Sequence, residues 1–86
     1  MWYVYILKSL KTDRYYIGHT ENLEKRLRQH NSGKTRSLKA YLPFEIIHSE
    51  KHDTKQEAYS RERRIKSYKG GEAFKRLIRR EDQKRQ

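Results

Sequence analysis

Two short segments near the N-terminus, rich in aromatic and β-branched residues, constrain the fold most. Residues 2–8 and 14–19 both have the composition of β-strands, and a polar turn region at 9–13 separates them. Two strands joined by so short a connection predict an antiparallel hairpin at the start of the chain.

The register of this hairpin decides which tyrosines meet. If Lys8 pairs with Asp13, Tyr5 lies directly opposite Tyr16, and cross-strand partners share one face of a sheet. Gly18, on the same strand as Tyr16, has no side chain, so another group can approach the backbone there. We therefore expect two tyrosines side by side next to an open stretch of backbone.

A helix is predicted directly after the hairpin. Asn22 is a good N-cap for residues 23–31, and Gly33 is a natural C-terminal stop. Arg26 and His30 are four residues apart, so they lie on one side of this helix. Arginine suits phosphate binding and histidine suits proton transfer, but a solvated helix face and a residue favoured by the helix dipole explain the pair equally well.

The remaining elements follow in short order. Residues 33–43 are expected to form a basic loop, and residues 44–48 form a third short strand. A capping box at 54–57 begins a second helix that runs to about Tyr68. A short last helix carries an apolar stripe that begins at Phe74.

Composition limits the size of the fold and the kind of partner. With 86 residues, 33% of them hydrophobic, the chain predicts one small domain at 1–80 and a charged tail at 81–86. A net charge of +11 favours a polyanionic partner, nucleic acid above all. We found neither a run of about 18 apolar residues nor a signal-peptide pattern, which predicts a cytoplasmic protein with no membrane partner.

Glu62 is the residue that fits a simple core least well. Ala58, Glu62 and Ile65 have the i, i+4, i+7 spacing of a core-facing stripe, where a carboxylate is costly unless it is paired or binds a cation. One interpretation is a cation site. The other is a salt bridge to a nearby arginine, the candidates being Arg26, Arg61, Arg63 and Arg64.

The two tyrosines also allow two interpretations. Tyr5 and Tyr16 are simple core aromatics if they only pack, which is a reasonable reading in a chain with 7 tyrosines. At the edge of a cationic site, a tyrosine can instead have its pKa lowered until it serves as a general base.

Taken in order, these segments resemble the GIY-YIG nuclease family, and its small single-domain bacterial branch in particular. Residues 3–5 occupy the first signature, with Tyr-Val in place of its Gly-Ile, and residues 16–18 match the second without change. Residues 25–30 resemble its helix signature and residues 58–66 its acidic-helix signature. The branch also has a Gly-Gly-Glu-Ala-Phe-Lys stretch, found here at 70–75.

The resemblance implies an α+β fold, with a three-stranded antiparallel sheet flanked by helices. It also implies a set of catalytic residues, namely Tyr5, Tyr16, Arg26, His30 and Glu62. Glu62 would hold one Mg²⁺ or Mn²⁺, Arg26 would neutralise the transition-state phosphate, and Tyr5 would take a proton from water with help from Tyr16 or His30. The basic loop would follow the nucleic-acid backbone through Lys34, Arg36 and Lys39.

The resulting prediction is a metal-dependent endonuclease that hydrolyses phosphodiester bonds in DNA. With no recognition domain attached, its target is expected to be a DNA structure, branched or single-stranded, rather than a sequence, alone or with a recruited protein partner. Two alternatives remain: a non-catalytic nucleic-acid-binding module on the same fold, and a structural, RNA-associated basic protein.

Overall fold

The computed structural model confirms the α+β fold. It describes residues 1–34, 36–68 and 71–85, with the backbone alone described for 36–38 and 80–85. In chain order the elements are β1 (Trp2–Ser9), β2 (Tyr15–Thr20), α1 (Leu23–Asn31), a 3₁₀ helix (Arg36–Tyr41), β3 (Phe44–His52), α2 (Lys55–Ser67) and α3 (Glu72–Arg85).

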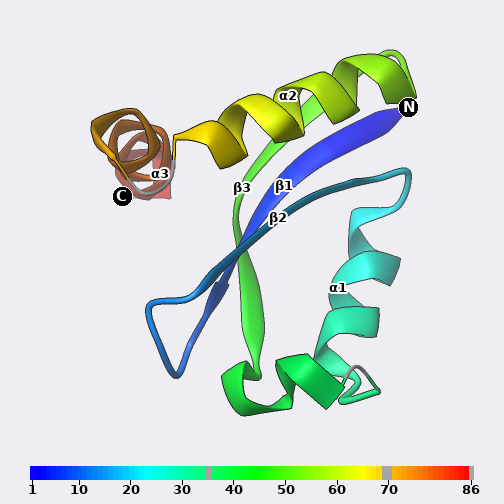
Figure 1. Ribbon diagram of the computed structural model, residues 1–86, viewed down its shortest axis with the longest axis vertical. Helices are drawn as coiled ribbons and strands as arrows, with labels where there is room; N and C mark the ends of the chain where they lie inside the picture. The colour runs from blue at the N-terminus through cyan, green and yellow to red at the C-terminus, as the bar shows by residue number, and fades with distance from the viewer. Residues whose placement is uncertain (35, 69–70, 86) are drawn as a thin grey trace.

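One antiparallel sheet, with strand order β2-β1-β3, separates two small apolar cores. On one face, Val4 and Ile6 of β1 pack with α2 and α3, where Ile65 and Phe74 are also buried. On the other face, Leu7 packs with partly buried side chains of α1. Figure 1 shows α1 on one side of the sheet and α2 on the other, so β1 is covered on both faces.

The predicted hairpin register is wrong by two residues. Tyr5 pairs with Gly18, and Lys8 pairs with Tyr15 rather than with Asp13. The Ser9 side chain causes the longer turn, because its Oγ accepts hydrogen bonds from two backbone N–H groups of that turn. Since the error is an even number of residues, every side chain keeps its predicted face of the sheet.

Local capping explains where the helices begin. The Asn22 side chain accepts a hydrogen bond from the Lys25 N–H, and the Thr54 side chain accepts one from the Glu57 N–H. Gly33 has φ of 77°, a left-handed conformation that glycine adopts without strain, just after α1.

Three elements are longer or more regular than predicted. β3 continues to His52, a 3₁₀ helix occupies much of the expected 33–43 loop, and α3 continues through charged residues to Arg85. Thr35 in that loop and Gly70 after α2 lie outside the described residues.

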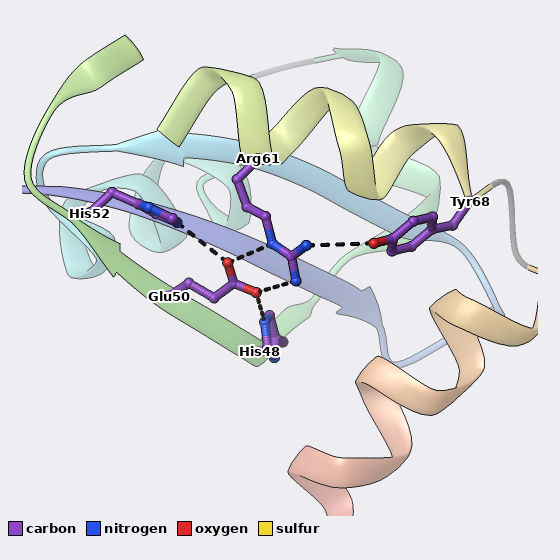
Figure 2. Close-up of polar contacts among 5 residues, drawn as sticks. All are labelled: His48, Glu50, His52, Arg61 and Tyr68. Carbon is purple, nitrogen blue, oxygen red and sulfur yellow. Dashed lines mark hydrogen bonds and ion pairs between the residues drawn. The ribbon is translucent and has the colours of Figure 1, made fainter. Parts of the chain in front are cut away.

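A network of charged side chains joins α2 to β3 (Figure 2). Glu50 accepts hydrogen bonds from Arg61 Nε at 2.8 Å and Nη2 at 3.0 Å. The Nε2 atoms of His48 and His52 lie 2.7 and 3.3 Å from the same carboxylate. Arg61 also donates to the Tyr68 hydroxyl at 3.5 Å, so one arginine links the end of α2 to the strand beneath it.

Candidate active site

A cavity of about 170 Å³ lies along β2, and four of the five predicted catalytic residues line it. Tyr5 comes from β1, Tyr16 from β2, Arg26 from α1 and Glu62 from α2. Side chains far apart in sequence therefore meet because β2 lies between the helices of the two sheet faces. The fifth residue, His30, lies beside this cavity, with its ring centroid 4.6 Å from that of Tyr16.

Gly18 determines how Tyr5 is placed. The Tyr5 ring covers the backbone of Gly18, where a Cβ atom would lie 2.5 Å from the tyrosine hydroxyl. This is the close approach that the glycine predicted. Any side chain at position 18 would displace the hydroxyl from the cavity.

The expectation of a lowered tyrosine pKa is wrong for Tyr5. The side chain is buried, and burial raises its pKa to about 12 against the opposing charge of Arg26. Removing water disfavours the phenolate more than one partly solvated guanidinium favours it. Tyr5 is therefore a neutral hydroxyl at neutral pH.

His30 is buried near the end of α1 and contacts both tyrosines. Its Nε2 lies 3.5 Å from the Tyr5 hydroxyl. Burial, and then the nearby charge of Arg26, lowers the pKa of His30, so the ring is neutral at neutral pH and can accept a proton. Asn31 fixes this end of the helix, since its side-chain amide exchanges two hydrogen bonds with the backbone of Phe44.

Glu62 is buried, as its position on the stripe predicts, but its partners are not arginines. His19 Nδ1 lies 2.6 Å from Oε1, and Lys66 Nζ lies 2.9 Å from Oε2. Burial alone would raise the pKa of Glu62, but the hydrogen bonds from His19 and Lys66 lower it. The carboxylate is thus ionised and accepts only, which requires His19 to donate from Nδ1.

The fit of a divalent cation to this cavity depends on Glu62. No group of three or more acidic, histidine or cysteine side chains is gathered as a metal cluster within the described part of the chain. Mg²⁺ does not need one, because it often binds through one or two carboxylates and completes its shell with water and phosphate. Glu62 fits that pattern, since each oxygen keeps a second lone pair beside its present hydrogen bond.

The predicted nucleic-acid-binding residues are only partly brought together. Lys34 lines a groove of about 510 Å³ along α1, together with Lys25, Arg26 and Arg28. Lys39 is exposed on the 3₁₀ helix, and the side chain of Arg36 lies outside the described residues. The basic surface beside the cavity therefore belongs mainly to α1 rather than to the expected loop.

Sequence reasoning missed His19 and Lys66. Lys66 follows Glu62 by four residues, a spacing that favours an ion pair and was a usable signal. His19 directly follows Gly18 in β2, and no local pattern links it to a glutamate 43 residues later. Its ring lies 5.6 Å from that of Trp2 and 5.8 Å from that of Tyr59, so aromatic contacts hold it against Glu62.

Comparison with known proteins identifies the class. The GIY-YIG catalytic domain matches residues 1–77, and the chain belongs to this nuclease family. Membership in a nuclease family implies a nucleic-acid substrate. No solved structure matches.

Several UPF0213 proteins are similar over most of their length. One from Haloquadratum walsbyi is 39% identical over 67 residues, covering 77% of this chain and 74% of its own. One from Clostridium perfringens is 43% identical, covering 77% and 71%, and one from Staphylococcus saprophyticus is 37% identical, covering 77% and 80%. A search of the described helices for one long and apolar enough to cross a membrane found none.

Proposed function

We propose that this chain is a metal-dependent endonuclease that hydrolyses phosphodiester bonds in DNA and selects its target by structure rather than by sequence. The observation that carries this proposal is the meeting of Tyr5, Tyr16, Arg26 and Glu62, from four different elements, on one small cavity. A tyrosine pair, an arginine and an acid at one point supply proton transfer, phosphate binding and cation binding together.

Proton transfer is assigned to Tyr5 and His30. The Tyr5 hydroxyl would take a proton from the attacking water while giving its own to Nε2 of the neutral His30 ring. This sequence needs no free phenolate, which the raised pKa of Tyr5 makes rare at neutral pH. The 3.5 Å separation is long for a hydrogen bond, but catalytic contacts often shorten only when substrate binds.

Charge stabilisation is assigned to Arg26 and Glu62. The exposed Arg26 guanidinium at the cavity would bind the non-bridging phosphate oxygens in a fork. Glu62 would hold Mg²⁺ or Mn²⁺, and the bound cation would polarise the scissile phosphate and stabilise the leaving oxygen. Lys66, whose side chain is 55% exposed, can leave the carboxylate without loss of core packing.

A non-catalytic nucleic-acid-binding module is the second candidate. It is favoured by the ion pairs of Glu62, because a carboxylate held by His19 and Lys66 also suits a purely structural role. In this role the basic groove along α1 would bind phosphates and the cavity would have no chemistry.

Hydrolysis assays separate the two candidates. The purified chain is incubated with Mg²⁺ or Mn²⁺ and with labelled single-stranded, branched and duplex DNA, with RNA of the same sequence alongside. We expect cleavage of DNA, and Tyr5→Phe should lower its rate roughly 10²–10⁴-fold with unchanged melting temperature and DNA affinity. Binding without cleavage on every substrate would support the non-catalytic module.

A further inference from the structure

A second concavity adjoins the cavity on the side of α3. It has a volume of about 440 Å³, and Ile17 of β2 and Lys66 of α2 line both it and the candidate active site. A ligand that spans the two would therefore cross the boundary formed by Ile17 and Lys66.

The interior of this second pocket is apolar and aromatic. Ile17, Ile65 and Ile78 line it together with Tyr15 and Phe74, whose rings meet edge to face with centroids 5.1 Å apart. Tyr15 is 36% exposed and Phe74 only 5%, so one ring is accessible while the other is fixed in the core. Such a surface suits a flat, apolar ring that can stack on an exposed aromatic side chain.

The rim of the pocket is basic. Among the described residues, Arg14, Lys66 and Lys75 surround it, and Asp13 contributes one carboxylate. An apolar floor with several cations at the edge suits a base attached to a phosphate. Phe74 and Lys75 also belong to the 70–75 stretch, which the catalytic set leaves unused.

We propose that this pocket binds one unpaired nucleobase next to the phosphate bound at Arg26 and at the cation on Glu62. The base would stack on Tyr15, and its phosphates would contact Arg14 and Lys75. The inference rests on the proposed function for its orientation, since continuity with the cavity is what favours a nucleotide over other ligands of the same shape. An extended acidic peptide, bound along the edge strand β2, is the other occupant that a test must exclude.

Isoleucine methyl groups make the test local. Ile17, Ile65 and Ile78 line the pocket. Ile46 packs against the core on the opposite face of the sheet and serves as the internal reference. The intact chain, labelled at isoleucine methyls and free of metal, is titrated by NMR with thymidine 5′-monophosphate. 2-Deoxyribose 5-phosphate, which has the phosphate but no base, is the matched ligand control.

We expect saturable shifts at the three pocket methyls with the nucleotide, and little change with the sugar phosphate. Tyr15→Ala should weaken nucleotide binding about five- to a hundredfold, the loss typical of one stacked base, while Leu10→Ala at the nearby hairpin turn should not. If Tyr15→Ala does not fold, the exposed Lys75→Ala should still weaken binding.

Equal shifts with both ligands, or none with the nucleotide, would overturn the proposal. So would a short acidic peptide that moves the three methyls when the nucleotide does not. Because the titration needs neither metal nor hydrolysis, it gives the same result in Glu62→Gln. Failure of the pocket and failure of the nuclease are therefore distinguished.

Discussion

Two glutamates associated with α2 show how differently a carboxylate can be used in one small domain. Glu50 on β3 has four donor atoms around it, from Arg61, His48 and His52 (Figure 2). Partial burial would raise its pKa, but the hydrogen bonds from Arg61 and His48 lower it to about 2. Glu62 on α2 has two, from His19 and Lys66, and lies at the wall of a cavity.

The two glutamates differ in how many carboxylate lone pairs remain available for further bonds. Two carboxylate oxygens offer about four lone pairs, and the network around Glu50 uses all of them. Glu62 keeps about half of its own, and it lines a cavity together with Tyr5, Tyr16 and Arg26. Glu50 therefore joins α2 to β3, whereas Glu62 keeps lone pairs for the cation that we propose.

Exchanging each carboxylate for an amide should affect hydrolysis at Glu62 but not at Glu50. Glu62→Gln should lower DNA hydrolysis roughly 10²–10³-fold, the loss typical of one electrostatic catalytic group, with DNA binding retained. Glu50→Gln should leave hydrolysis per folded molecule unchanged. Rates are compared after the folded fraction of each variant has been measured by circular dichroism.

Full activity in Glu62→Gln would place the cation elsewhere, and a large fall in its melting temperature without metal would make Glu62 a structural ion pair like Glu50. Either result would remove the contrast between the two glutamates.

Arg26→Lys tests whether the arginine that shares the cavity with Glu62 binds the substrate phosphate. Lysine keeps the charge but cannot present a planar fork, so we expect hydrolysis to fall about tenfold to a hundredfold with a smaller change in binding. Binding by many cations should weaken steeply with salt in both proteins. The matched control is Arg28→Lys, at another exposed arginine of the same helix. If both variants cleave like wild type, Arg26 belongs to the solvated surface of α1.

Glu50→Gln should have its main effect on stability. Leaving Arg61 without its carboxylate should cost about 1.5–3 kcal/mol of the free energy of unfolding. The pKa of Glu50 is lowered from 4.5 to about 2, so its stabilisation is present above pH 4.5 and is lost as the pH falls toward 2. Urea unfolding at several pH values should show a shallower acid dependence in the variant. An unchanged curve would mean that the network stabilises nothing.

The sequence alone was sufficient to predict those features that depend on the residues of a single helix or strand. The cap at Asn22, the stop at Gly33 and the helix that begins after Thr54 follow from local chemistry, and the structure confirms them. Burial of Glu62 followed from helical periodicity. The two faces of β2 were also correct, because an error of two residues preserves them.

The predictions that failed concern features that depend on contacts between distant segments. The turn length was set by the Ser9 hydroxyl, and the partner of Glu62 was set by where β2 passes α2, which brings up His19. Of the two interpretations of Tyr5, the lowered pKa is wrong, because burial of the side chain outweighs the charge of Arg26. The burial of Tyr5 comes from packing against distant segments, including Phe44 and Leu27, which no local motif reports.

The smallest expected effect concerns the protonation of His30. Its contribution to the pH dependence of stability should be separable from that of Glu50. Burial lowers the pKa of His30 below its ordinary 6.5, so the unfolded chain takes up this proton first and stability falls as the pH drops below 6.5. The loss ends at the folded-state pKa of His30. His30→Gln, which cannot be protonated, should remove the upper part of the acid dependence and leave the part below pH 4.5. Urea unfolding between pH 7 and pH 5 measures this, with His52→Gln as a partly exposed control. Parallel curves for wild type and His30→Gln would show that the ring is not buried in its neutral form, and the proton acceptor for Tyr5 would then have to be sought elsewhere.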